Sequence, residues 1–82
     1  MPYFVYLLAC VDKTLYCGYT ANLSARVQMH QSGKASKYTR ARLPVNLVYS
    51  EKFTLRRDAL RHEYAIKQLS REQKIKLVKK SH

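Results

Sequence analysis

The sequence predicts an α+β fold, in which a three-stranded antiparallel sheet is flanked by helices in the order ββαβαα. Tyr3 to Cys10 form an unbroken apolar and aromatic run, which is typical of a central strand covered on both faces. Leu55 to Leu69 carry apolar residues at helical spacing, which indicates a long amphipathic helix. The chain has 82 residues and no internal repeat or linker, so we expect one domain over residues 1–82 with a thin core.

A second strand is expected at Leu15 to Thr20, joined to the first by a hairpin loop at residues 11–13. A three-residue loop would pair Tyr6 with Gly18 and bring the Tyr6 and Tyr16 phenols to the same face of the sheet. A two-residue loop would put these phenols on opposite faces. In the first arrangement, Gly18 would leave room above the backbone for a phosphate or a ring.

The first helix is expected to begin after Asn22, which can cap it, and to run to about Gln31, with Gly33 ending it. Residues 32–43 then form a basic loop. The third strand, Val45 to Phe53, alternates apolar and polar residues, which suggests a half-buried edge strand. Its predicted apolar face consists of Val45, Leu47, Tyr49 and Phe53.

The last two helices have candidate caps at their N-terminal ends. Thr54 is placed to cap the long helix, and Ser70 with Gln73 matches a capping box for a short final helix.

Glu63 lies within the apolar stripe of the long helix, which also contains Ala59 and Ile66. Burying an unpaired carboxylate would cost on the order of several kcal/mol, so a cation must meet it. The cation could be a metal ion or, alternatively, Lys67 one turn on or Arg56 two turns back.

The charge balance, with 16 Lys and Arg against 5 Asp and Glu, predicts a nucleic-acid partner. A role in solubility or a ribosomal location is the alternative. Two runs concentrate the positive charge. The first is Lys34, Lys37, Arg40 and Arg42, and the second is Lys74, Lys76, Lys79 and Lys80.

No apolar run approaches the ~18 residues of a membrane span, so we expect no membrane association and a cytoplasmic location. Cys10 and Cys17 are too few for a disulfide framework and lack the spacing of a zinc site. Both are interpreted as small buried strand residues.

The chain resembles the GIY-YIG nuclease superfamily through the paired tripeptides Phe4-Val5-Tyr6 and Tyr16-Cys17-Gly18. The basic run Gly33 to Arg40 is similar to that of the small stand-alone bacterial members. Further matching positions, in order along the chain, are Arg26, His30 and Glu63.

This resemblance implies hydrolysis of a phosphodiester bond by an in-line water, with Tyr16 as general base. Arg26 would clamp the scissile phosphate, and Glu63 would be the sole protein ligand of Mg²⁺ or Mn²⁺. Tyr6 and His30 would position the nucleophile.

The basic run would hold flanking phosphates, and Tyr38 could stack on an unpaired base. The basic-run residues given this role are Lys34, Lys37, Arg40 and Arg42. We expect DNA rather than RNA as substrate, chosen by its structure, and a possible protein partner that supplies specificity. The oligomeric state stays open.

Each site residue also has a structural interpretation. The tyrosines suit any strand, Arg26 could be a solvated cation, and His30 a surface residue near a helix C-terminus. The first tripeptide has Phe4 in place of glycine, and no Asn or Asp follows Glu63, whereas larger members carry an asparagine there. Two functions therefore remain: a metal-dependent endonuclease, and a nucleic-acid-binding module without turnover.

Overall fold

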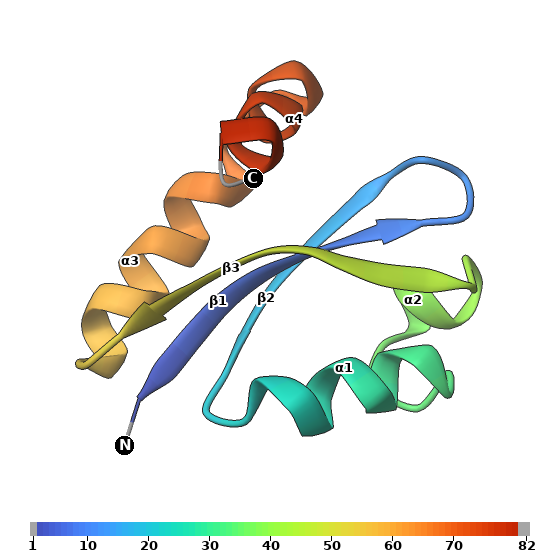
Figure 1. Cartoon of the computed structure of the whole chain (residues 1–82), viewed down its shortest axis with the longest axis horizontal. Coiled ribbons are helices and arrows are strands. Elements are labelled where there is room, and N and C mark those ends of the chain that lie inside the picture. Colours follow the sequence, from blue (N-terminus) through green and yellow to red (C-terminus); the bar gives the residue numbers. More distant parts are fainter. Residues whose placement is uncertain (1, 81–82) are drawn as a thin grey trace.

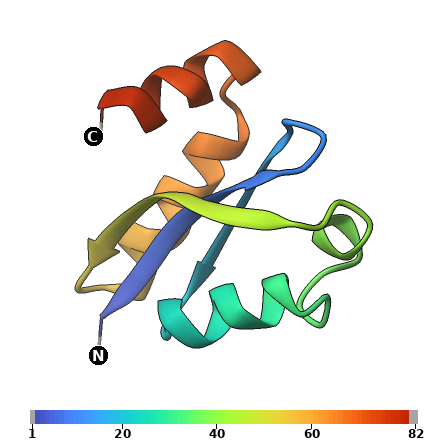
Figure 2. The ribbon, with the colours of Figure 1, turned by 45° about the vertical axis from the view of Figure 1, so that its right-hand side comes forward.

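The computed structural model describes residues 2–80, and its three strands form one antiparallel sheet in the order β2-β1-β3 (Figures 1 and 2). The predicted α+β class and the central position of the first strand are confirmed. Helix α1 covers one face of the sheet and helix α3 the other (Figure 1). The elements are β1 (Tyr3–Cys10), β2 (Leu15–Thr20), α1 (Leu23–Gln31), α2 (Lys37–Arg40), β3 (Val45–Phe53), α3 (Arg56–Lys67) and α4 (Arg71–Lys80).

The hairpin between β1 and β2 has the three-residue loop that places both phenols on one face. The Cys10 amide donates to the Thr14 carbonyl at 2.9 Å, and Lys13 adopts a left-handed backbone with φ of 68°. A turn followed by one left-handed residue is the usual form of such loops. Tyr6 therefore pairs with Gly18, as predicted.

Strand β3 departs from the simple alternation predicted for it. Leu7 of β1 pairs with Tyr49, but Leu8 pairs with Leu47, so Val48 is an extra residue in the ladder. A bulge of this kind exchanges the faces on its two sides. The predicted single apolar face is therefore wrong: Val45 packs on the α1 side and Tyr49 on the α3 side.

The predicted helix caps are partly confirmed. The Asn22 side chain accepts from the Ala25 amide at 3.2 Å, and the reciprocal bonds of the Ser70 and Gln73 capping box are both present. The prediction for Thr54 is wrong, because Leu55 is the extended residue that precedes α3 and no side chain caps the helix. Thr54 lies one residue too early to reach the first-turn amides.

The predicted basic loop at residues 32–43 contains the short helix α2. Ser36 caps this helix, its hydroxyl accepting from the Tyr38 amide at 3.1 Å. The single helical turn directs Thr39 inward, where it is fully buried, while Lys37 and Arg40 stay exposed.

Each face of the sheet has its own small core. The α3 side holds Val5, Leu7, Cys17, Tyr49, Ala59 and Ile66. The α1 side holds Tyr6, Leu8, Cys10 and Val45. Both cysteines are free and buried, as interpreted from the sequence. Within residues 2–80, every helix is too short or too polar to cross a bilayer.

Candidate active site

A buried hydrogen-bonded chain links Tyr6 on β1 to His30 on α1 and Thr39 on α2. The Tyr6 hydroxyl lies 2.8 Å from His30 Nε2, and His30 Nδ1 lies 2.8 Å from Thr39 Oγ1. The exposed fractions of Tyr6, His30 and Thr39 are 1%, 1% and 0%. The structural alternative of a surface His30 is therefore wrong.

The partners of this chain fix the positions of its protons. Thr39 Oγ1 also lies 3.3 Å from the Ser36 carbonyl, which can accept its proton. We therefore assign the tautomer in which His30 donates from Nδ1 to Thr39, because it gives every buried donor of the chain an acceptor. His30 Nε2 then accepts the Tyr6 proton. The opposite tautomer would leave the buried Tyr6 hydroxyl proton without an acceptor, which costs about 1–3 kcal/mol. Both ring nitrogens of His30 are thus occupied.

Burial reinforces this arrangement. It lowers the pKa of His30, and the nearby positive charge of Arg26 acts in the same direction. Burial also raises the pKa of Tyr6 far above its ordinary value of 10.0. Tyr6 and His30 therefore form a neutral pair near pH 7.

Gly18 allows the Tyr6 ring to lie flat against strand β2. A Cβ atom at residue 18 would stand 2.5 Å from the Tyr6 hydroxyl oxygen, closer than real contacts permit. The space above Gly18 is thus filled by the Tyr6 phenol and is not left open as expected from the sequence.

Tyr16 lies over this pair and is half-buried. Its ring centroid is 5.1 Å from that of His30, 6.5 Å from that of Tyr6 and 5.8 Å from that of Tyr38. Within residues 2–80, its hydroxyl takes part in no hydrogen bond. Tyr16 therefore combines a fixed ring with a hydroxyl that remains available.

Arg26 is exposed on α1, four residues before His30. Burial lowers the pKa of His30 and the charge of Arg26 adds to that shift, while the same charge partly offsets the burial-driven rise of the Tyr6 pKa. Among the described residues it forms no salt bridge.

Glu63 lies on α3, on the opposite face of the sheet, next to the edge strand β2. Cys17 Sγ lies 4.0 Å from the Glu63 carbonyl oxygen. Burial raises the pKa values of Cys17 and Tyr6, and the negative charge of Glu63 adds to both shifts. The Glu63 side chain is only 16% exposed, and Lys67 Nζ lies 3.3 Å from its carboxylate. One of the two ion pairs considered from the sequence is thus present.

Glu63 is the candidate metal ligand, and the residues around it can be compared with what a divalent ion requires. No group of three or more His, Cys, Asp or Glu side chains within residues 2–80 is arranged to hold a metal. Mg²⁺ and Mn²⁺ do accept one carboxylate when water and substrate phosphate supply the remaining oxygens. The single carboxylate of Glu63 fits such a site, with the exposed Lys67 as a competing cation.

The predicted phosphate-binding residues divide into two kinds. Lys34, Lys37 and Arg40 are exposed. Arg42 instead joins α2 to the hairpin loop, because its Nε donates to Asp12 at 2.9 Å and its guanidinium lies 3.8 Å above the Tyr38 ring. Tyr38 is 37% exposed, so part of its ring remains open.

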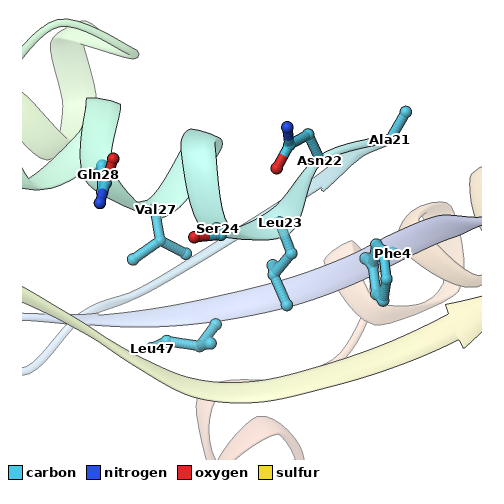
Figure 3. A pocket seen from close by; sticks show the side chains of 8 residues that line it. All are labelled: Phe4, Ala21, Asn22, Leu23, Ser24, Val27, Gln28 and Leu47. Carbon is cyan, nitrogen blue, oxygen red and sulfur yellow. The ribbon is translucent and has the colours of Figure 1, made fainter.

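A hollow of about 610 Å³ lies between α1 and the strands β1 and β3 (Figure 3). The side chains of Leu23, Val27 and Leu47 point into it from the helix and the sheet. It is lined by Phe4, Ala21, Asn22, Leu23, Ser24, Val27, Gln28 and Leu47. None of these residues is ionisable, so this hollow lacks groups for acid–base chemistry.

Thr39 is the network residue that the sequence did not identify. Thr39 lies three residues after Ser36, a candidate helix cap, and this spacing was the sequence signal for a helical turn that contains it. A signal for the burial of His30 was also present, because Leu23, Val27 and His30 recur at the spacing of one helix face.

Comparison with known proteins identifies the family. The family model described as the GIY-YIG catalytic domain matches residues 2–76. UPF0213 proteins of Staphylococcus haemolyticus and Oceanobacillus iheyensis are 49% and 50% identical over 76 residues, covering 93% of this chain and 93% and 88% of theirs.

Two structures determined by solution NMR are also similar. A UPF0213 protein from Bacillus halodurans is 44% identical with a TM-score of 0.64, covering 96% of this chain and 84% of its own. A protein from E. faecalis is 38% identical with a TM-score of 0.68, covering 100% of this chain and 88% of its own. The chain therefore belongs to the GIY-YIG nuclease domain family and, within it, to the UPF0213 proteins, a membership that implies nuclease-type activity.

Proposed function

We propose that this protein is a divalent-metal-dependent endonuclease that hydrolyses phosphodiester bonds in DNA and selects its substrate by structure. The observation that carries the proposal is the packing of Tyr16 against the buried Tyr6–His30 pair, with Arg26 and Glu63 close enough to act on Tyr6 electrostatically. Nucleases of this family generally use divalent metals.

The two tyrosines have different roles in this proposal. Tyr6 is buried and donates its proton to His30, so its hydroxyl is not available to a water molecule. Tyr16 keeps an available hydroxyl on a fixed ring. We assign Tyr16 as the general base: once its own phenol proton has passed to solvent, the phenolate takes a proton from the attacking water. Tyr6 and His30 are assigned as positioning residues.

Arg26 and the metal ion that Glu63 would hold would stabilise the negative charge that develops on the phosphate. The planar guanidinium of Arg26 can donate to two phosphate oxygens at once. Glu63 would hold Mg²⁺ or Mn²⁺, and the bound ion would supply charge stabilisation at the same phosphate.

The exposed cations next to the site would bind the flanking backbone. Lys34, Lys37 and Arg40 supply charge without sequence preference, while Arg42 contributes mainly by holding the Tyr38 ring. Tyr38 could then stack on an unpaired base, which favours flapped or branched substrates over a continuous duplex.

The second candidate function is a nucleic-acid-binding module without turnover. Its supporting observation is the Glu63–Lys67 ion pair, which supplies the cation that the carboxylate requires without any metal. A protein partner that supplies specificity is compatible with either function.

Incubation with flapped, branched and single-stranded DNA, and with matching RNAs, separates the two functions. We expect cleavage of a structured DNA with Mg²⁺ or Mn²⁺ and none with EDTA. Glu63→Ala should abolish cleavage while leaving binding nearly unchanged, since the basic segment is intact. Glu72→Ala removes an exposed carboxylate of the same charge and should cleave normally.

The outcome that supports the binding module is equally specific. Wild type would then bind these nucleic acids in a salt-sensitive way and cut none of them with either ion. Its affinity would equal that of Glu63→Ala.

A further inference from the structure

A second hollow, of about 280 Å³, lies at the far end of the edge strand β2. Arg26 of α1 and Arg56 of α3 both line it, so helices on opposite faces of the sheet each contribute a cation to this hollow. At about 30 Å³ per water molecule it has room for about nine, which is ample for a hydrated phosphate group. The lining residues are Tyr3, Tyr19, Thr20, Ala21, Arg26 and Arg56.

No carboxylate contributes to the lining of this hollow. The salt bridges of the described residues lie elsewhere: Asp12 with Arg42, Glu51 with His62, and Glu63 with Lys67. Two arginines therefore line one hollow, and neither forms a salt bridge within residues 2–80.

Tyr19 orders one side of the hollow. The Arg56 Nε and Nη2 atoms donate to the Tyr19 hydroxyl oxygen at 3.3 and 3.1 Å. Within the described part of the chain, the Tyr19 hydroxyl proton is used in no hydrogen bond. The hollow thus presents the remaining guanidinium N–H groups and a phenol O–H as donors, which suits an anion with several acceptor oxygens.

We propose that Arg56 and Tyr19, together with Arg26, bind a backbone phosphate of the nucleic acid adjacent to the one being cleaved. Arg26 is shared between this hollow and the Tyr6–His30 network, since its charge acts on both tyrosine and histidine there. The assignment of the neighbouring phosphate rests on the proposed nuclease function. The nucleic acid would then run along the β2 edge, from the Tyr16 and Tyr38 rings to Arg56.

Binding of a labelled single-stranded oligonucleotide, measured in EDTA at several salt concentrations, tests this subsite separately from cleavage. Arg56→Gln should weaken binding about tenfold, since a charge-assisted contact is lost. It should also flatten the slope of log K against log salt by about 0.7. Tyr19→Phe should weaken binding roughly threefold with an unchanged slope, because no charge is removed.

Arg57→Gln is the matched control, because Arg57 is the exposed neighbour of Arg56 and does not line the hollow. We expect it to change affinity less than about twofold. Arg56→Lys keeps the positive charge but loses the planar guanidinium with its several donors. It should therefore weaken binding without flattening the slope of log K against log salt. Circular dichroism of each variant verifies folding.

Equal weakening by Arg56→Gln and Arg57→Gln would overturn the subsite, as would an unchanged slope for Arg56→Gln. In that case the proposed nuclease function survives if wild type still binds in a salt-dependent way. Failure of wild type to bind any oligonucleotide would overturn both.

Discussion

Two tyrosine–histidine pairs lie on opposite faces of the same sheet. On the α1 side, Tyr6 meets His30 Nε2 at 2.8 Å, and on the α3 side Tyr49 meets His62 Nε2 at 2.9 Å. Tyr6 and His30 are both 1% exposed, whereas the His62 side chain is 29% exposed. Similar residues and distances thus occur in very different surroundings.

The two pairs differ in which residue donates the hydrogen bond between tyrosine and histidine. Tyr49 donates its hydroxyl proton to Glu51 at 2.9 Å, so His62 must be the donor in its contact with Tyr49. In the other pair, Thr39 accepts from His30, which leaves His30 Nε2 as the acceptor for Tyr6.

The additional partner, Thr39 in one pair and Glu51 in the other, therefore determines which residue of the pair donates. A carboxylate draws protons toward itself, whereas a threonine that is already donating to a carbonyl holds a neutral imidazole in one tautomer. The first pair is a fixed support beneath Tyr16, and the second is a polar cluster at the rim of the core. Removing members of each pair tests this difference.

Loss of the histidine should have the largest effect on stability. His30→Asn leaves buried partners without hydrogen bonds and opens space in the core, so we expect a loss of about 3 kcal/mol in the free energy of unfolding. His62→Asn should cost less than about 1 kcal/mol because water can replace the half-exposed ring. Urea denaturation of both variants measures the difference, and equal losses would contradict it.

Gly18→Ala should have the next largest effect, because the added Cβ must displace the Tyr6 ring. We expect a loss of about 1–3 kcal/mol, the range for overpacking in a core. Ser50 pairs with Tyr6 from the other neighbouring strand and is exposed, so Ser50→Ala is the control and should change stability by less than about 0.5 kcal/mol. Thermal unfolding measures both variants, and a Gly18→Ala protein with the Tm of wild type would show that the Tyr6 ring has room to move.

The pH dependence should be the smallest effect. Burial and the Arg26 charge lower the pKa of His30 below its ordinary 6.5, so the unfolded state binds more protons once the pH falls below that value. Stability from this group should decline as the pH falls from 6.5 to the folded pKa, by at most about 1.4 kcal/mol per pH unit.

Titration of the His30 ring protons by NMR checks the sign directly. His30→Asn should show a shallower decline in stability than wild type over the same range. A His30 resonance that titrates above pH 6.5 would contradict the buried neutral assignment.

The elements with a strong apolar pattern or clear capping residues were predictable from sequence, whereas the bulge in β3 and the short helix α2 were not. The apolar run of β1 and the amphipathic α3 determine the sheet order and its two covered faces. The bulge at Val48 leaves no trace in an alternating pattern, because an extra residue changes the register without changing composition. Helix α2, with four residues, is too short for a helical period to appear.

In the candidate site, the sequence predicted which strand residues share a face of the sheet, but not all of their partners. The shared face of Tyr6 and Tyr16 follows from the loop length, and the structure agrees. The spacing of His30 with Leu23 and Val27 indicates its burial, but its bond to Thr39 depends on how α2 packs against α1, which local pattern does not specify. Arg42 was grouped with the exposed cations because its partner, Asp12, is thirty residues away in sequence.

The central claim is that Tyr16, supported by the neutral Tyr6–His30 pair, is the group that activates water. Cleavage of a structured DNA with Mg²⁺ or Mn²⁺ should therefore be compared between wild type, Tyr16→Phe and Tyr38→Phe. We expect Tyr16→Phe to bind normally but to lose at least about 100-fold in cleavage rate, the usual contribution of a general base. Tyr38→Phe keeps a neighbouring ring and removes a hydroxyl that has no catalytic role, so its rate should stay close to wild type. A Tyr16→Phe protein that cleaves as fast as wild type would contradict the claim.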